Sequence, residues 1–445
     1  MFRRLELPHP LILLLGGVAI ATLLTWILPA GEYDRRDDEA TGRRVVVAGT
    51  YRPVDPAPVG PLAAVVALPR GFIEAADVVA VVLFVGGAWV VVDRLGTLTR
   101  LVGGLVRRFR HRGLLAIPVV SLFFASMGAL ENMQEEIIAL VPVLLILGRG
   151  LGVDAVAVVA MSAGAAMIGS AFGPTNPFQA GIAMKLAELP PISGAGARTA
   201  MLVVAVGLWI AWTLRYAVRT RVAATGLREP DAAPATSKDL AIFLFVLAPM
   251  AAYVYGALAW GWGLNELSAG FFGAGMIAGI AGGLGLAGTA TAYLEGMASL
   301  LPASVLIGIT RSITVVLSDG RVIDTILQGL ATPLAGFSPM TAALLMIPVH
   351  GLIHVFVPSV SGHAVLSMPV LVPLSDLLGI SRQVTVVAYQ VGAGLTELLT
   401  PTNGALMAIL LAAGVPYDKW IRFALGGVVL AAVVGIGGML LMAGT

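Results

Sequence analysis

GPTNPF (Gly173 to Phe178) and TPTNGA (Thr400 to Ala405) place the same Pro-Thr-Asn tripeptide inside two long apolar stretches. Proline removes a backbone N–H and cannot continue a helix, so each tripeptide predicts a break in a helix. A break frees backbone carbonyls that can coordinate a cation, and it leaves a half-helix N-terminus that can face an anion. Thr and Asn add side-chain donors and acceptors at the same point.

The tripeptides recur in register with their surroundings. The tripeptide at 174–176 returns 227 residues later at 401–403, and the same offset relates the Leu-Gly pair at 151–152 to the pair at 378–379. Such a match predicts an internal structural repeat of hairpin, helix, break and half-helix. Two unrelated kinks in a packed bundle would not need this shared order, so we interpret the breaks as parts of a site.

The composition indicates a membrane protein. Of 445 residues, 58% are hydrophobic and 12% are charged, about half the charged fraction of a soluble domain. The apolar residues fall in continuous runs of roughly 17–25, the length of a membrane-spanning helix, which predicts an all-α polytopic protein in a lipid bilayer. The absence of cysteine excludes thiol chemistry, and the small net charge of +2 argues against nucleic acid as a partner. We expect the first apolar run to be a retained helix rather than a cleaved signal peptide.

The apolar runs divide the chain into two halves around a charged, Pro/Ala-rich linker. The first half, 1–218, is predicted to contain scaffold helices 10–29 and 78–95, an inner hairpin 113–150, a broken helix 154–188 and a helix 198–218. The cytoplasmic linker is 219–239. The second half, 240–445, is predicted to contain helices 240–258, 268–288 and 298–318, an outer hairpin 335–379, a broken helix 381–413 and a helix 420–443. Residues 30–77 are expected to form a polar loop.

The hairpins are predicted to be re-entrant. Ile137 to Leu147, which follows the polar ENMQEE, is about half the roughly 20 residues of a full crossing. The positive-inside rule places the N-terminus in the cytoplasm because of Arg3 and Arg4, and it returns the chain there at Arg107 to Arg112. Span 240–258 has no counterpart in the first half, so the repeats are inverted and the C-terminus lies outside. Inverted repeats with broken helices are typical of secondary transporters, here of a bacterial cytoplasmic membrane.

Several segments resemble the YfcC family, which belongs to the anaerobic C4-dicarboxylate carrier-like group of the ion transporter superfamily. The resemblance is carried by LPAGEYD (from Leu28), ALENMQEEIIAL (from Ala129), NPFQAGIA (from Asn176), SVSGHAVLSMPVLVPLSDLLGISRQVTVVAYQ (from Ser359), TPTNGALMA and VPYDKW. It implies a scaffold domain that forms a homodimer, and a transport domain of two hairpins and two broken helices that moves as an elevator. The family includes proteins named dicarboxylate carriers and basic amino-acid antiporters. Relative to the family pattern, His363 replaces a common Gln, Asn403 a common Ser, and Glu397 a neutral polar residue or His.

Four acids are candidates for ion coupling, because ionisable residues inside a membrane are usually functional. They are Glu131, Glu135, Glu136 and Glu397. Adjacent, partly desolvated carboxylates suit a coupled proton or a sodium ion, although solvated acids in a wet turn would have the same sequence. Glu397 precedes Pro401 by one helical turn and is expected to face the break, where it binds a cation or pairs with Arg311.

Arg311 lies in an apolar span, where a charge costs about 2.5–3.5 kcal/mol on insertion scales. A substrate carboxylate would offset this cost through a bidentate contact, and a permanent ion pair with an acid such as Glu397 would do so equally. The complete set of candidate substrate-binding residues is Asn132, Thr175, Asn176, Arg311, Ser359, Ser361, Gly362, His363, Thr402 and Asn403.

The histidines have competing interpretations. His363 could titrate near neutral pH, or it could be a hydrogen-bonded structural residue. His350 and His354 share one helical face, but a metal site would need a third ligand and none is evident in the sequence, so we expect packing. No metal and no cofactor are predicted.

These patterns together predict a secondary active transporter for a small solute that bears a carboxylate. A C4-dicarboxylate or short organic acid is the first expectation and a basic amino acid the alternative, with a proton or sodium ion coupled to transport. A channel would need a continuous polar path, and a membrane-embedded enzyme would need a nucleophile–base set that the sequence does not contain. The chain also contains no phosphate-binding Gly-x-x-x-x-Gly-Lys motif, so ATP-driven pumping is not expected.

Overall fold

The computed structural model describes residues 9–39, 43–98, 100–101, 104, 113–190, 193–221, 234–260 and 262–443, and these are mostly helical. Eight helices among them are long and apolar enough to cross a membrane, with the run 264–319 taken as one. The prediction of an all-helical, multi-pass membrane protein is therefore confirmed. The basic segment Arg107 to Arg112 and most of the predicted linker 219–239 lie outside the described residues.

One set of helices packs around α3 and α13, and we call it the first helix group. It consists of α1 (Pro10–Ile27), α2 (Pro61–Glu74), α3 (Ala76–Arg94), α11 (Ser237–Trp260), α12 (Leu264–Gly279) and α13 (Gly285–Asp319). Small residues allow these helices to approach closely. A Cβ on Gly71 of α2, for example, would lie 2.5 Å from the backbone nitrogen of Ser312 in α13.

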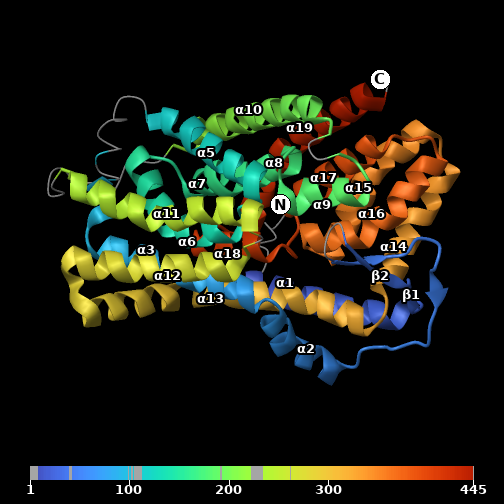
Figure 1. The fold of residues 1–445 in the computed structure, drawn as a ribbon, viewed down its shortest axis with the longest axis horizontal. Helices are drawn as coiled ribbons and strands as arrows, with labels where there is room; N and C mark the ends of the chain where they lie inside the picture. Colours follow the sequence, from blue (N-terminus) through green and yellow to red (C-terminus); the bar gives the residue numbers. More distant parts are fainter. Residues whose placement is uncertain are drawn as a thin grey trace, which may run out of the picture.

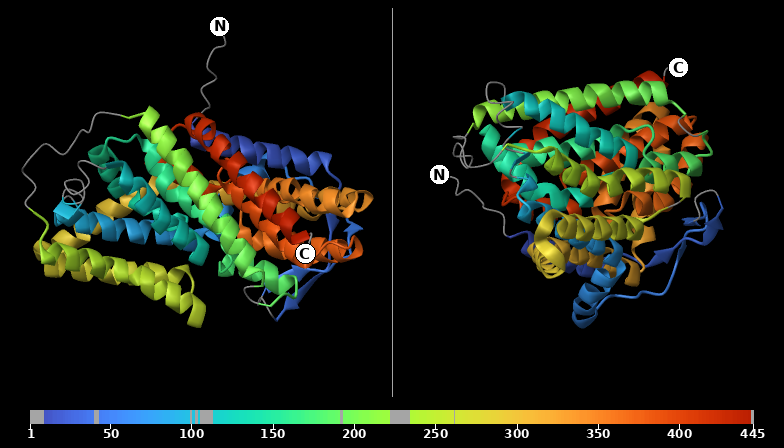
Figure 2. Two further views of the ribbon diagram at one scale, coloured as in Figure 1. Left: turned by 90° about the horizontal axis from the view of Figure 1, so that it is seen from above. Right: turned by 60° about the vertical axis from the view of Figure 1, so that its left-hand side comes forward.

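A second set of helices, which we call the second helix group, packs around α8 and α17. It consists of α5 (Ala116–Glu131), α6 (Glu135–Leu151), α7 (Ala155–Val159), α8 (Ala165–Phe172), α9 (Ile182–Leu186), α10 (Ala195–Arg219), α15 (Pro339–Phe356), α16 (Val360–Leu377), α17 (Arg382–Glu397), α18 (Gly404–Ala412) and α19 (Tyr417–Ala443). Figure 1 shows the first group along the lower edge and α10 with α19 along the upper edge, and Figure 2 shows α10 and α19 crossing the outer face. The groups meet where α6 packs on α3 and α18 packs on α13.

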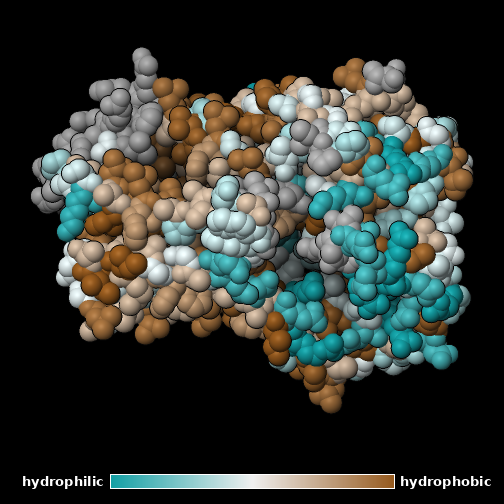
Figure 3. Space-filling model, viewed as in Figure 1, coloured by the Kyte–Doolittle hydropathy of each residue, from teal (hydrophilic) through white to brown (hydrophobic). Residues whose placement is uncertain are grey.

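Residues 30–77, which the sequence predicts to be a polar loop, contain short strands and a helix. β1 (Gly31–Glu32) pairs with β4 (Arg52–Pro53), and β2 (Arg35–Asp38) pairs with β3 (Arg43–Val46), both antiparallel. The second part of this segment forms α2, because Pro61 starts a helix and the apolar residues that follow pack on α13. The strands lie beside α14 (Ile323–Ala331), over the hydrophilic region at the lower right of Figure 3.

The turn between α12 and α13 comes earlier than predicted. The sequence patterns suggested helices over 268–288 and 298–318, whereas α13 already begins at Gly285. The connecting turn, η4 (Ile280–Leu284), contains Gly283 with φ 108°, and Gly285 follows with φ 68°. Glycine adopts this left-handed backbone without the steric cost that a Cβ adds, so the chain reverses here.

Each half of the chain contains a helix pair followed by a broken helix. α5 and α6 form the first pair and α15 and α16 the second. α6 has 17 residues rather than the 11 expected, because Glu135 and Glu136 begin the helix and Arg149 lies in its last turn. Charged residues at these ends suit the helix dipole, acids at the start and bases at the end.

The broken helices follow these pairs. α7 and α8, joined by the π-helical η2 (Ala160–Gly164), end before Gly173, and η3 (Pro177–Gly181) leads into α9. α17 likewise ends at Glu397, and α18 begins at Gly404. Pro-Thr-Asn lies in each gap, as the sequence predicts.

Candidate functional site

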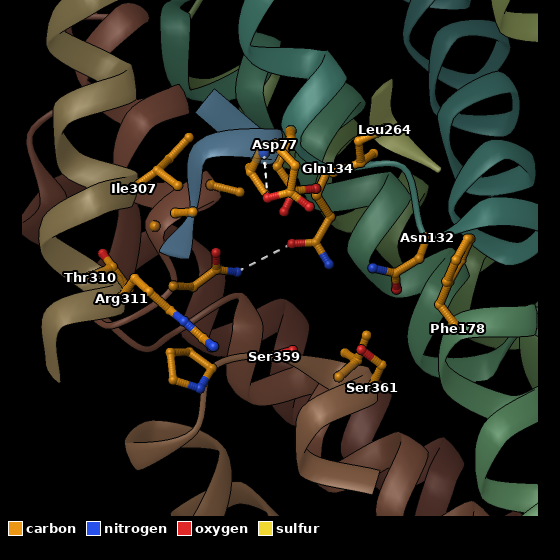
Figure 4. A pocket seen from close by; sticks show the side chains of 18 of the residues that line it. Asp77, Asn132, Gln134, Phe178, Leu264, Ile307, Thr310, Arg311, Ser359 and Ser361 are labelled. Atoms are coloured by element: carbon orange, nitrogen blue, oxygen red, sulfur yellow. Dashed lines mark hydrogen bonds between the residues drawn. The ribbon is translucent and has the colours of Figure 1, made fainter. Parts of the chain in front are cut away.

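A pocket of about 490 Å³ lies between the two helix groups (Figure 4). The first group contributes the α2–α3 junction, the start of α12 and one face of α13. The second group contributes the α5–α6 turn, the α15–α16 turn and the break between α17 and α18. This volume suits a small organic solute.

The wall of the pocket is rich in acids. Six carboxyl groups and one guanidinium line it, from Glu74, Asp77, Glu131, Glu135, Glu136, Glu397 and Arg311. The four acids that the sequence singled out are therefore brought together at one pocket. Glu74 and Asp77 were missed, although two acids next to an apolar span were a usable signal.

Arg311 reaches the pocket from α13, on the opposite side from Asn132 and Gln134 in Figure 4. Its Nε donates to Glu74 Oε2 at 3.1 Å, and the side chains of the pair are 40% and 42% exposed. The sequence suggests an ion pair between Arg311 and an acid such as Glu397 as one alternative. Arg311 does form an ion pair, but its partner is Glu74 and not Glu397. α2, which the sequence did not predict, brings Glu74 next to Arg311 within the first group. In the described part of the chain, the two terminal guanidinium nitrogens make no hydrogen bond.

Glu397 lies at the end of α17 and is 4% exposed. Its Oε2 accepts a hydrogen bond of 2.6 Å from Gln134 Nε2, and its Oε1 lies 3.5 Å from His354 Nε2. The carboxylate therefore connects the pocket wall to a histidine in the interior of the second group.

Gln134 connects several parts of the wall, and the sequence reasoning overlooked it. Besides its bond to Glu397, its Oε1 accepts from Asn403 Nδ2 at 3.3 Å and its backbone N–H donates to Glu136 Oε2 at 3.2 Å. It thus ties the α5–α6 turn to the break between α17 and α18. Its place inside ENMQEE, next to the acids, was the available signal.

The acids of the α5–α6 turn differ in their contacts. Both carboxyl oxygens of Glu131 are buried and have no hydrogen-bond partner among the described residues, whereas Glu136 accepts from the backbone N–H of Gln134. Glu135 lies in the first turn of α6 and is partly exposed. A buried, ionised carboxylate without a partner is costly, so burial disfavours the charged form of Glu131.

In the second break, Asn403 caps α18 and lies in the pocket wall. Its Oδ1 accepts from Leu406 N at 3.2 Å, while Nδ2 donates to Gln134 and to the backbone oxygen of Glu397. Thr402 is not in the wall, because its hydroxyl donates to Val355 O in α15 at 2.7 Å.

In the first break, Asn176 has a similar capping role but lies outside the pocket wall. Its Oδ1 accepts from Phe178 N and Gln179 N, each at 3.0 Å, and its Nδ2 donates to Gly128 O in α5 at 3.3 Å. Thr175 is also outside the wall and donates to Ala129 O. Both Thr side chains therefore tie a break to the first helix of the preceding pair.

Asn132 ends α5 in the left-handed conformation, with φ 61°, which Asn tolerates better than most residues. Its side chain accepts from Ser170 and from Asn176, and it also lies in the pocket wall. The first break thus meets the pocket through Asn132 and also through Phe178 of η3, which lines the wall itself.

The α15–α16 turn presents Ser359 and Ser361 to the pocket (Figure 4). Ser359 Oγ also caps α16 by accepting from Gly362 N at 3.3 Å, and Gly362 itself is not in the wall. His363 is fully buried beside His350 and His354, so it does not touch the pocket. His363 was considered separately in the sequence analysis, and the structure places it in contact with His350 and His354. Among the described residues, no group of His, Asp or Glu is arranged to hold a metal ion.

Comparison with known proteins gives one family match over nearly the whole chain. The model of the C4-dicarboxylate anaerobic carriers (DcuC) matches residues 7–444. YfcC of Escherichia coli (strain K12), provisionally named a basic amino acid antiporter, is 29% identical over 470 residues, covering 94% of this chain and 93% of that protein. An uncharacterized protein of Haemophilus influenzae is 25% identical over 473 residues, with the same coverage.

Two solved transporter structures also resemble the fold. The YdaH transporter of Alcanivorax borkumensis has a TM-score of 0.47 and 18% identity, and the match covers 98% of both chains. MtrF of Neisseria gonorrhoeae, described as one of a class of antimetabolite efflux pumps, has a TM-score of 0.45 and 15% identity over 99% of this chain and 96% of that one.

Proposed function

Because the chain belongs to the DcuC family of C4-dicarboxylate anaerobic carriers, we propose that it is a secondary active transporter that binds a small solute in the pocket between its two helix groups. The family is one of carriers and the Escherichia coli relative is named as an antiporter, so the chain is a membrane transporter and not an enzyme. The solute, the coupled ion and the movement are the parts that we propose.

We propose a basic amino acid, such as arginine or ornithine, as the solute. The observation that carries this proposal is the excess of carboxyl groups in the wall, six against one guanidinium that is already paired. The acids would bind the cationic side chain and amine, and the terminal nitrogens of Arg311 would bind the carboxylate. The provisional name of the Escherichia coli relative agrees with this choice.

A C4-dicarboxylate is the second candidate. The family description favours it, and Arg311 is a donor of the geometry that binds carboxylates. This solute would require protons or sodium ions on several of the wall acids, because carboxylates that are close together repel. Its binding should therefore depend more steeply on pH or on sodium than that of a basic amino acid.

For the transport step, we propose that the second helix group slides past the first as an elevator. The pocket between the groups supports this, since such a movement would carry its inner wall across the membrane. The similar caps at Asn176 and Asn403, and the similar Thr contacts to α5 and α15, support the inverted repeat that we propose. We further propose a homodimer in the bacterial cytoplasmic membrane, with the N-terminus inside and the C-terminus outside.

A thermal-shift screen of the detergent-purified protein tests the proposed solute. A ligand that binds the folded state raises its unfolding temperature by mass action. Arginine and ornithine should stabilise the protein, each with and without sodium and at two pH values. Stabilisation by succinate alone would favour the second candidate, and no stabilisation by either class would contradict a carboxylate-bearing solute.

A further inference from the structure

Three histidines and one glutamate form a continuous buried chain next to the pocket. His350 Nδ1 lies 2.9 Å from His363 Nε2, and His363 Nδ1 lies 3.3 Å from His354 Nδ1. His354 Nε2 in turn lies 3.5 Å from Glu397 Oε1. All three rings are fully buried, whereas Glu397 belongs to the pocket wall. The chain therefore leads from the pocket into the interior of the second helix group.

The two ring–ring hydrogen bonds restrict where the protons of the chain can lie. A neutral imidazole has one N–H and one acceptor nitrogen. His363 uses both nitrogens in these bonds, so it must donate to one neighbour and accept from the other. If His363 donates to His354, then His354 carries its proton on Nε2, which has no hydrogen-bond partner in the described part of the chain. If His363 donates to His350 instead, His354 donates from Nδ1, and its Nε2 is free to receive a further proton.

We propose that Glu397 and this histidine chain are the proton-binding site that couples transport, an inference that rests on the proposed transport function. In the unloaded state the three rings are neutral, His354 carries its proton on Nδ1, and His363 and His350 carry theirs on Nε2, so His354 Nε2 is an unprotonated nitrogen 3.5 Å from Glu397 Oε1. In the loaded state a proton from the water of the pocket is bonded to His354 Nε2, and His354 is an imidazolium beside the Glu397 carboxylate. Ring N–H bonds increase from three to four, one O–H bond of a hydronium ion breaks, and no other bond changes.

The geometry explains why a proton can be held here. A buried imidazolium is unfavourable without a counter-charge, and Glu397 is an acid at 3.5 Å from His354. Gln134 holds that carboxylate in place through a 2.6 Å hydrogen bond. Loading keeps both ring–ring bonds, so it leaves no nitrogen between the rings without a partner.

The other titratable and charged groups around the chain are few among the described residues. The ring of Tyr389, from α17, packs against His350 and His363, and its hydroxyl donates to Val360 O. The acids of the α5–α6 turn line the same pocket on the side of Glu397, where Gln134 joins that turn to Glu397. The first group contributes the ion pair of Arg311 with Glu74 and the carboxylate of Asp77. Glu397 is thus the acid that contacts the histidines.

The position of the proton-binding site predicts whether the proton and the solute cross the membrane in the same direction or in opposite directions. His350, His354, His363 and Glu397 all belong to α15, α16 and α17, so the proton would move with the second helix group. A cationic solute bound at Glu397 would repel the imidazolium of His354. The site therefore favours the exchange of a proton for a basic solute rather than their transport together.

Nitrogen-15 NMR of histidine-labelled protein in nanodiscs tests this inference without any solute. The chain has five histidines, and replacing His9 and His111 by Gln leaves the three of the site. Imidazole nitrogens with and without a proton have well-separated signals. Spectra recorded at about pH 8 and at about pH 5 should show one further protonated nitrogen, His354 Nε2, at the lower pH, while His350 and His363 keep their protons on Nε2.

Glu397→Gln removes the counter-charge with little change of shape and should abolish the protonation of His354 Nε2. Glu74→Gln, a matched acid on the opposite wall, should leave it as it is in the parent. A His354 Nε2 that stays unprotonated at the lower pH, or that is protonated equally in Glu397→Gln, would overturn the inference. The thermal-shift screen for solutes is a separate measurement, so failure of one proposal can be told apart from failure of the other.

Discussion

Arg311 on α13 and Glu74 at the end of α2 form an ion pair in the pocket wall, with Arg311 Nε 3.1 Å from Glu74 Oε2. Both side chains are partly exposed, and such a pair contributes about 0–1 kcal/mol. A solute carboxylate can therefore compete with Glu74 for the guanidinium. We therefore expect the pair to influence how strongly the wall attracts an anion.

Glu74→Gln should release Arg311 from its partner and remove one negative charge from the wall. We expect binding of succinate to strengthen about threefold to tenfold, and binding of arginine to weaken by a similar factor, corresponding to about 0.7–1.4 kcal/mol. Titration of the unfolding temperature with each solute measures both. As a control, Glu32→Gln removes the partner of Arg321 at a distant ion pair and should change neither. Unchanged affinities in Glu74→Gln would mean that Arg311 does not contact the solute.

The contact between α5 and α8 leaves no room for a side chain at two glycines. A Cβ on Gly128 would overlap the backbone of Ala166, and a Cβ on Gly169 would overlap the backbone of Ala125. Either glycine replaced by Ala should lower the free energy of unfolding by about 2–4 kcal/mol, since backbone atoms must move apart. Gly207→Ala is the matched control, because a Cβ there meets no atom within 4 Å. Equal stability of all three variants in thermal unfolding would contradict this packing.

Asn176→Ala and Asn403→Ala, one substitution in each helix break, should impair the protein in different ways. Asn176 is fully buried and bonds only inside the protein, so its loss should destabilise the fold by about 2 kcal/mol or more. Asn403 contacts Gln134 in the pocket wall, so its loss should abolish uptake with a smaller loss of stability. Unfolding temperatures and uptake rates, measured on the same preparations, separate the two effects. Normal uptake by Asn403→Ala would show that this break is structural only.

A disulfide across the two helix groups should lock the proposed elevator. A Cβ on Gly404 of α18 would lie 3.3 Å from the Cβ of Thr310 in α13, close to the separation in disulfides. The chain has no cysteine, so Gly404→Cys with Thr310→Cys creates the only pair. Oxidation should stop uptake and reduction should restore it, while each single variant is unaffected by oxidation. Full uptake by the oxidised double variant would contradict sliding between the groups.

The local pattern of the sequence was sufficient to predict the helix pairs and the breaks. Proline and asparagine act on the backbone within a few residues, so Pro-Thr-Asn predicted both gaps. The acids of ENMQEE were also predicted to share a site with Glu397, and the pocket brings them together.

The partners of the charged residues could not be predicted in the same way. Arg311 and Glu74 are separated by 237 positions, and their contact depends on how α2 packs against α13. The buried histidine chain likewise needs the turn between α15 and α16, which folds His363 back onto His350 and His354. Such contacts follow from tertiary packing, for which hydrophobic patterns along one segment contain no signal.

Counterflow in proteoliposomes tests the central claim most directly, namely that the acidic pocket exchanges a basic amino acid. Vesicles loaded with unlabelled arginine would receive external labelled arginine in trace amount, with and without excess external succinate. We predict accumulation of label that succinate does not reduce and that Glu397→Gln abolishes. Counterflow of labelled succinate with none of arginine would contradict the claim and assign the pocket to dicarboxylates.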